Sequence, residues 1–254
     1  MNPFLLIAAL LVLYSFKNYK QAFFLFLAFR LFLNNNINLI NLPGVPLLTL
    51  EVFMSIFFAL LYVVKRKRYS RIITTVPLPF NKAFIWVLLS YVVSSVISIA
   101  GIQNTFPSLL SIFFCDFICV YLCWKLISGK EDIIKIVNLL LGAFLLICIY
   151  AFVELFLGFN PVMDYEIDLA GPRATDWQYL DDERGSRIQS FFLHPIGGSI
   201  NFGLIFCLCL YGYVYYKAYF SKFQLQTMLL IGIMAFIASL LSNSRTPLVF
   251  LAIA

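Results

Sequence analysis

The chain has 254 residues, of which 62% are hydrophobic and only 12% are charged, and its mean hydropathy is +0.93. A soluble globule needs more polar surface than this composition supplies, so a soluble enzyme or binding module is excluded. We expect an all-α polytopic protein embedded in a lipid bilayer. The formal net charge of +6 comes from basic residues between apolar runs, so it signals topology and implies no nucleic-acid partner.

Eight apolar runs and the start of a ninth are each close to the roughly 20 residues that a helix needs to cross a bilayer. The predicted spans cover residues 3–16, 21–40, 47–64, 84–102, 106–127, 136–157, 194–216 and 225–241, and the ninth starts at residue 247. No soluble domain fits between them. We therefore expect one membrane domain over residues 1–254, with the chain truncated inside the ninth span.

Basic residues follow the first, third, fifth and seventh predicted spans. They include Lys17, Lys20, the run from Lys65 to Arg71, Lys130, Lys135, Lys217 and Lys222. The positive-inside rule makes these loops cytoplasmic and places the N-terminus outside.

One long polar loop, residues 158–193, lies between the sixth and seventh predicted spans, on the outer side. It contains seven of the twelve acidic residues of the chain, and Trp177, Asp181 and Asp182 stand close together in it. Carboxylates accept hydrogen bonds from sugar hydroxyls and flat aromatic rings pack on sugar faces, so this loop suits a carbohydrate. The alternative is a solvated acidic loop that only keeps the outer face soluble.

Four ionisable residues fall within predicted spans, where an unpaired charge is costly: Arg30, Glu51, Asp116 and Glu154. Arg30 and Glu51 are at similar depths in consecutive antiparallel spans, which predicts a buried ion pair; the alternative is a role in a substrate groove. Asp116 indicates either a hydrogen bond between helices or part of a polar pathway. We expect Glu154, close to the outer surface, to reach water.

Three of the six cysteines, Cys115, Cys119 and Cys123, recur every four residues and share one helix face. We interpret these cysteines as small apolar residues at a contact between helices rather than as a metal or redox site. We expect no metal and no cofactor.

Two predicted spans begin at the outer face with an early proline, Pro195 and Pro247. A helix N-terminus carries unsatisfied N–H groups and partial positive charge, which favour an anion. Arg187 precedes one of these ends and Arg245 stands at the other, and each can bind phosphate bidentately. With His194 they predict a pyrophosphate site at the level of the lipid headgroups. The alternative is that the arginines only anchor helix ends.

These residues carry a family resemblance. The stretch Arg187-Ile-Gln-Ser-Phe-Phe-Leu-His194-Pro195, followed by Leu-Ser-Asn-Ser244-Arg245, resembles the O-antigen ligase and polymerase family of bacterial polysaccharide assembly. The resemblance covers residue 187 to the C-terminus.

The resemblance implies a multi-span glycosyltransferase of the bacterial inner (cytoplasmic) membrane with its site at the periplasmic face. Its donor is an oligosaccharide on a polyprenyl diphosphate such as undecaprenyl diphosphate, and its acceptor is a glycan or a lipid. Arg187 and Arg245 match the arginines expected to contact the pyrophosphate leaving group. His194, Ser244, Trp177, Asp181 and Asp182 are supporting residues. The catalytic base is expected beyond the C-terminal end, so His194 is not assigned that role.

Two other functions fit the same residues. A transporter or flippase for a lipid-linked or anionic solute would use the outer arginines for binding and the intramembrane charges as a polar pathway. A noncatalytic fragment or assembly subunit would lack the base.

Overall fold

The computed structural model describes residues 3–33, 38–40, 48–69, 81–98, 102–162, 188, 190–192 and 195–242. Helices dominate this part of the chain, and one short antiparallel strand pair joins Asn38–Ile40 (β1) to Leu48–Thr49 (β2). The helices are α1 (Pro3–Lys17), α2 (Tyr19–Phe29), η1 (Arg30–Phe32), α3 (Leu50–Tyr69), α4 (Asn81–Ile97), α5 (Ile102–Ser111), η2 (Ile112–Ile118), α6 (Cys119–Leu126), α7 (Lys130–Leu157), α9 (Pro195–Tyr215), η5 (Lys217–Tyr219) and α10 (Lys222–Leu241). The all-α expectation is therefore confirmed at the level of fold class, with the β1–β2 pair as a small exception.

Four of the described helical stretches are long and apolar enough to cross a membrane: Leu109–Leu126, Lys130–Leu157, Ile196–Tyr215 and Lys222–Leu241. The apolar helices α1 and α4 are shorter, with 15 and 17 residues. The described residues therefore support a membrane protein, but they do not support the expected count of eight spans.

The second predicted span, residues 21–40, is wrong in its C-terminal half. The helix ends in the 3₁₀ turn η1, and Leu33 already has an extended backbone with φ −84° and ψ 120°. Residues 38–40 then form strand β1. Three consecutive asparagines occupy positions 34–36. Asparagine is a poor helix former because its side chain competes for backbone hydrogen bonds, which explains why an apolar run on its far side does not continue the helix.

The chain divides into two compact units, one formed by Met1–Leu27 and Ile37–Ile133 and the other by Ala28–Asn36 and Ile134–Ala254. In the first unit, large aromatic side chains fill the core between α2 and α3. Phe26 stacks on Phe58 with ring centroids 5.0 Å apart, and the buried Tyr19 hydroxyl donates a hydrogen bond of 2.9 Å to the Phe58 carbonyl. Because phenyl rings bury much apolar area, this cluster fixes α2 against α3.

The cysteines of the first unit lie at a contact between helices. Cys115 and Cys119 are buried, and their thiols lie 3.7 and 3.6 Å from the Ser55 hydroxyl of α3. Cys115 belongs to η2, a π-helical stretch within the continuous helix from α5 to α6. Small side chains let this wider turn pack closely on α3, as expected for cysteines at a helix contact.

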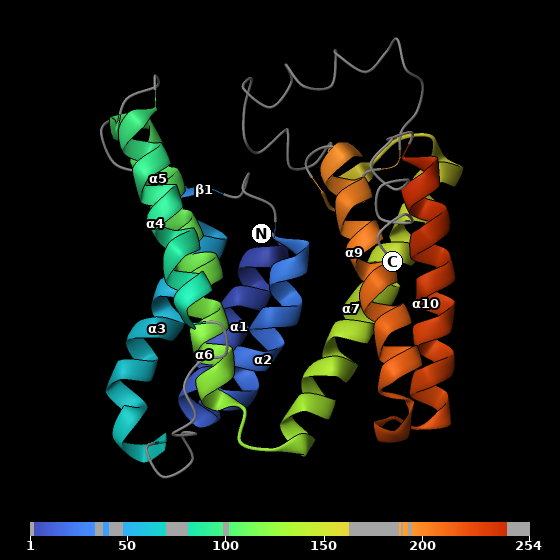
Figure 1. The fold of residues 1–254 in the computed structure, drawn as a ribbon, viewed down its shortest axis with the longest axis horizontal. Helices are drawn as coiled ribbons and strands as arrows, with labels where there is room; N and C mark the ends of the chain where they lie inside the picture. The colour runs from blue at the N-terminus through green and yellow to red at the C-terminus, as the bar shows by residue number, and fades with distance from the viewer. Residues whose placement is uncertain are drawn as a thin grey trace. The chain divides into compact units, whose positions relative to one another are not determined.

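In the second unit, α9 and α10 run antiparallel and pack side by side (Figure 1). They share a core with α7 that includes Ile147, Phe202 and Ile231, all fully buried. A Cβ added at Gly232 would lie 3.6 Å from the Cys209 Cβ, an ordinary van der Waals distance, whereas one added at Gly212 would lie only 3.2 Å from the Met228 sulfur, so α9 and α10 approach most closely at Gly212. Helix α10 begins with a capping box between Ser221 and Gln224.

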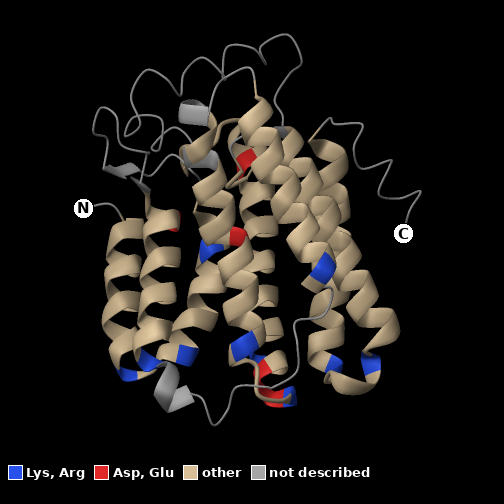
Figure 2. Cartoon of the chain, turned by 60° about the vertical axis from the view of Figure 1, so that its left-hand side comes forward, with Lys and Arg blue, Asp and Glu red and all other residues tan. Residues whose placement is uncertain are grey.

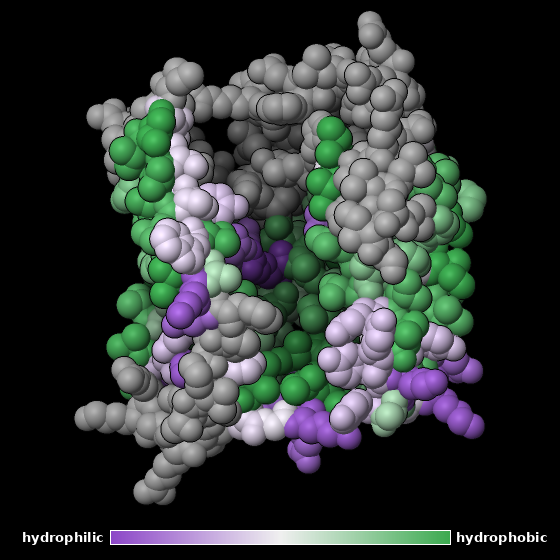
Figure 3. All heavy atoms as spheres, viewed as in Figure 1, coloured by the Kyte–Doolittle hydropathy of each residue, from purple (hydrophilic) through white to green (hydrophobic). Residues whose placement is uncertain are grey.

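The outer surfaces of the helices are apolar, as a lipid environment requires. Figure 3 shows apolar residues over much of the flank of α10, with polar residues gathered near its lower end. Within each unit, most of the described Lys and Arg residues lie at one end of the helices (Figure 2). In the first unit, for example, the Lys65 ammonium donates hydrogen bonds of 2.9 and 3.0 Å to the carbonyls of Ser15 and Phe16 at the C-terminal end of α1. This segregation is the pattern on which the topology prediction depends.

Candidate functional site

The residues that the sequence assigns to a pyrophosphate and sugar site lie outside the described residues. They are Arg187, Arg245, His194, Ser244, Trp177, Asp181 and Asp182. What the structure describes is the scaffold that borders them in the sequence: Ile188 follows Arg187, Pro195 follows His194, and Ser242 precedes the Asn243–Arg245 stretch.

A short segment before α9 is built into the core of the second unit. We call its described residues, Ile188 and Ser190–Phe192, the strap. Ile188 and Ser190 are 2% and 0% exposed. The Phe191 ring packs on Tyr150 of α7 with centroids 4.5 Å apart, and Phe192 meets Phe202 of α9 edge to face at 5.8 Å. The end of the long loop is therefore fixed to the helices.

All three polar groups of Ser190, its N–H, hydroxyl and carbonyl, form hydrogen bonds. Its backbone N–H donates to Glu154 Oε2 at 2.7 Å, its hydroxyl donates to the Ile147 carbonyl at 3.0 Å, and its own carbonyl accepts from Asn160 Nδ2 at 2.7 Å. Its φ of 55° is left-handed, a conformation that costs a non-glycine residue about 1–2 kcal/mol. Such a conformation persists only where the surroundings over-determine it, as three hydrogen bonds do here.

The other end of the loop is tied to the same place. The Tyr150 hydroxyl donates to Asn160 Oδ1 at 2.7 Å and accepts from the Val162 N–H at 3.0 Å. Since Asn160 also holds Ser190, the chain just after α7 and the chain just before α9 are joined through one side chain. The predicted loop over residues 158–193 thus has a closed base on α7.

The expectation that Glu154 reaches water is wrong. Its side chain belongs to a residue only 6% exposed, and it accepts the Ser190 N–H. The strap covers the helix end that a count of residues along α7 places at the surface. The sequence offers one local sign of this cluster: Tyr150 and Glu154 are four residues apart and so share one face of the helix. Nothing in the sequence around Ser190 or Asn160 indicates that these residues join them.

The start of α9 and the end of α10 adjoin at this end of the second unit. The Ser239 hydroxyl donates to the Ser199 carbonyl at 3.2 Å, and the Ser242 hydroxyl donates to the Ser239 carbonyl at 2.7 Å. The N-terminal end of α9 and the C-terminal end of α10 therefore lie side by side. Arg187 lies eight residues before Pro195, the first residue of α9, and Arg245 lies four residues after Leu241, the last residue of α10.

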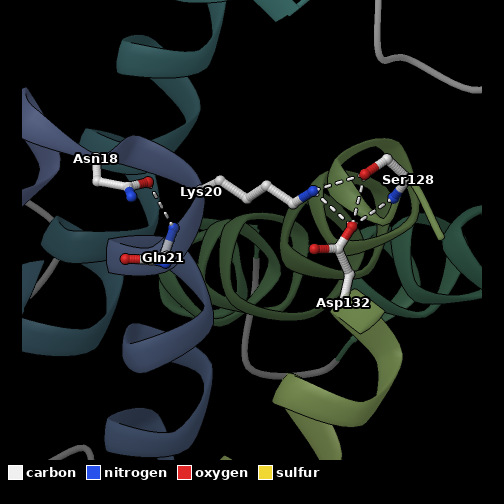
Figure 4. Close-up of polar contacts among 5 residues, drawn as sticks. All are labelled: Asn18, Lys20, Gln21, Ser128 and Asp132. Atoms are coloured by element: carbon white, nitrogen blue, oxygen red, sulfur yellow. Dashed lines mark hydrogen bonds and ion pairs between the residues drawn. The ribbon is translucent and has the colours of Figure 1, made fainter. Parts of the chain in front are cut away.

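A second polar cluster lies in the first unit, at the start of α7 (Figure 4). Lys20 of α2 pairs with Asp132 Oδ2, and the same oxygen accepts from the Ser128 N–H at 2.9 Å and the Ser128 hydroxyl at 2.6 Å. The Lys20 ammonium also donates to the Ser128 hydroxyl at 2.8 Å. Asp132 caps the first turn of α7, where a carboxylate is favoured.

The proposed Arg30–Glu51 ion pair stays a prediction. Arg30 is half-buried in η1 and belongs to one unit, whereas Glu51 is buried in the first turn of α3 and belongs to the other. A carboxylate in a first turn is stabilised by the helix dipole. Asp116 lies on an exposed part of η2, and both of its interpretations stay predictions.

Within the described ranges, no group of three or more His, Cys, Asp or Glu side chains is arranged to hold a metal ion. No protein-family model, curated protein or solved structure matches the chain. A functional assignment therefore depends on the chemistry of the site residues and their scaffold.

Proposed function

We propose that this chain forms the donor site of an O-antigen ligase- or polymerase-like glycosyltransferase at the periplasmic face of the bacterial inner membrane. The main support is the position of the two arginine motifs in the sequence: Arg187 to Pro195 leads into α9, and Ser244-Arg245 follows α10. The start of α9 and the end of α10 are joined by the hydrogen bond from the Ser239 hydroxyl to the Ser199 carbonyl. Two arginines beside a helix N-terminus favour a pyrophosphate.

The proposed reaction transfers an oligosaccharide from a polyprenyl diphosphate to a glycan or lipid acceptor. An acceptor hydroxyl attacks the anomeric carbon, the bond from that carbon to the diphosphate oxygen breaks, and the hydroxyl proton passes to a general base. Negative charge grows on the departing diphosphate. Arg187 and Arg245, with His194 and Ser244 in support, stabilise that charge through bidentate hydrogen bonds and the N–H groups of the first turn of α9.

The long loop supplies the sugar-binding part of the proposal. Trp177 offers a flat apolar face, and Asp181 and Asp182 accept hydrogen bonds from sugar hydroxyls. Support comes from the closed base of the loop on α7, since Asn160 joins its two ends next to the start of α9. We propose that the loop binds the sugar chain of the same donor whose pyrophosphate the two arginines bind.

We also propose the finer topology. The remaining apolar helices cross the bilayer together with the four long ones, giving eight spans and the start of a ninth, with the N-terminus outside. The grouping of lysines at one end within each unit supports this arrangement (Figure 2).

The test replaces each arginine in the full-length protein, expressed from its own locus, and compares variants at matched membrane abundance. We expect Arg187→Ala and Arg245→Ala each to lower transfer by about 100-fold or more, the range reported for removing one charge-stabilising donor. Arg245→Lys should also lose most activity because lysine lacks the bidentate fork. Arg173→Ala, in the same loop but outside the motifs, is the matched control.

The readout is the amount of unused polyprenyl-linked oligosaccharide and its membrane leaflet, found with a glycan label that cannot cross the membrane. A transferase defect leaves the donor labelled from outside. Unused donor that only the cytoplasmic side exposes would instead indicate a flippase. Normal product from both alanine variants would remove the pyrophosphate site.

A further inference from the structure

We infer that Glu154 is a positioning residue for this donor site, an inference that rests on the proposed function. Glu154 touches no substrate in this scheme. It acts through Ser190, whose N–H it accepts at 2.7 Å. Ser190 lies between the two groups that the proposed site requires, three residues after Arg187 and five before Pro195, the first residue of α9.

The strap can transmit position because Ser190 is buried and is hydrogen-bonded through all three of its polar groups. Its N–H, hydroxyl and carbonyl are bound by Glu154, the Ile147 carbonyl and Asn160, all on α7 or just after it. Ile188, the residue after Arg187, is buried in the same core, and consecutive Cα atoms lie about 3.8 Å apart, so the strap holds the chain at the position next to Arg187. A misplacement of about 1 Å in a reacting site can cost about 100-fold in rate.

The charge of Glu154 matters beyond its shape. A buried N–H bound to a carboxylate makes a hydrogen bond about twice as strong as one to a neutral acceptor. The strain of the left-handed Ser190 opposes the bound arrangement. Replacing the carboxylate by an amide keeps an acceptor of the same size but weakens this bond, whereas alanine leaves the buried N–H without its partner.

Trypsin offers a test that does not depend on activity. The bond between Arg187 and Ile188 is a tryptic site, and a protease must draw several residues on both sides of it into an extended conformation. The buried Ile188 and Ser190 resist this in the native protein. With full-length protein in right-side-out vesicles, we expect Glu154→Ala to speed cleavage of this bond at least 10-fold relative to cleavage after Arg173, and Glu154→Gln to speed it less.

Two control variants separate the strap from general loosening. Glu131→Ala removes an exposed acid from the other end of α7, and Leu141→Ala weakens the core of the second unit at a position thirteen residues before Glu154. Neither should speed cleavage at Arg187 relative to Arg173. An unchanged cleavage rate in Glu154→Ala, or an equal increase in Leu141→Ala, would overturn the inference.

The activity measurement connects the strap to the donor site. Rates are normalised to the folded fraction, so that lost protein does not count as lost catalysis. We expect Glu154→Ala to lower kcat/KM for the lipid-linked donor at least 10-fold and Glu154→Gln to recover part of it. Faster cleavage with undiminished kcat/KM would refute the positioning role. If Arg187→Ala and Arg245→Ala keep full transfer, the proposed function fails first, and the positioning role fails with it even though the strap geometry stands.

Discussion

The two ends of α7 each bury a carboxylate, and they satisfy it in opposite ways. Asp132, 8% exposed, lies in a charged pair with Lys20 and takes two further hydrogen bonds from Ser128. Glu154, 6% exposed, accepts the backbone N–H of a serine in a left-handed conformation. The first arrangement joins side chains of two helices and a short connection. The second fixes the backbone of a loop.

This difference shows how precisely each cluster fixes the groups that it joins. A lysine side chain is long and flexible, so the Asp132 cluster tolerates small shifts between its elements. A backbone N–H has no such freedom, so the Glu154 cluster defines the position of the chain itself. The end that borders the arginine motifs is thus the more tightly specified of the two, as the proposed diphosphate site would require.

A third buried carboxylate, Glu51, allows a test of whether an ion pair such as that of Asp132 and Lys20 also occurs elsewhere in the chain. If Glu51 pairs with Arg30, then Arg30→Met leaves the buried Glu51 carboxylate without that arginine and should cost about 3–5 kcal/mol of unfolding free energy. Glu51→Gln leaves only the half-buried Arg30 and should cost less. The double variant should recover much of this loss. Unfolding in detergent or bicelles provides the measurement. A double variant as damaging as the two single losses added together would show that the two residues act independently.

A smaller effect is expected at Asp132. Asp132→Asn keeps an acceptor for Ser128 but removes the pairing with the partly exposed Lys20, so we expect a loss of about 1 kcal/mol or less. The loss should shrink in 1 M salt, because partly exposed pairs are screened. Glu154→Gln should lose stability equally at low and high salt. An equal salt response of the two variants, measured by unfolding, would erase the contrast between the ends of α7.

The smallest net effect is expected at Ser190. Ser190→Gly removes the hydroxyl bond to Ile147 but also relieves the left-handed strain, so the two terms of about 1 kcal/mol should nearly cancel. Ser190→Ala loses the bond and keeps the strain, so it should be about 1 kcal/mol less stable than the glycine variant. Thermal unfolding of both variants measures the difference. An alanine variant as stable as the glycine variant would show that the φ of 55° carries no strain.

Local pattern in the sequence was enough to find most of the helices. Apolar runs predicted α7, α9 and α10 with their C-terminal ends within a residue or two of Leu157, Tyr215 and Leu241. The starts were less accurate. α7 begins six residues before its predicted start, because its first turn holds Glu131 and Asp132, which a helix N-terminus favours but a search for apolar residues rejects. α10 begins three residues before its predicted start, after a capping box between Ser221 and Gln224 that a search for apolar residues does not detect.

The contacts between Glu154, Ser190 and Asn160 could not be predicted from local sequence patterns, for a physical reason. The Glu154 and Ser190 pairing joins residues 36 apart, and nothing around Ser190 in the sequence requires a left-handed backbone. Position along a helix predicts depth in the bilayer but not what else covers that position, which is why Glu154 was expected to reach water. The residues with recognisable chemistry, Arg187 and Arg245, could be chosen from the sequence because charge and spacing are local properties.

The closed base on α7 also has an evolutionary consequence. Because Asn160 and Tyr150 hold the two ends of the loop together, the helices experience the same boundary whatever chain lies between Val162 and Ile188. Doubling the length of a flexible loop between fixed ends costs only about 0.6 kcal/mol in closure entropy. Insertions and replacements there are therefore thermodynamically inexpensive, so the length and sequence of this loop can change while α7 and α9 stay constant.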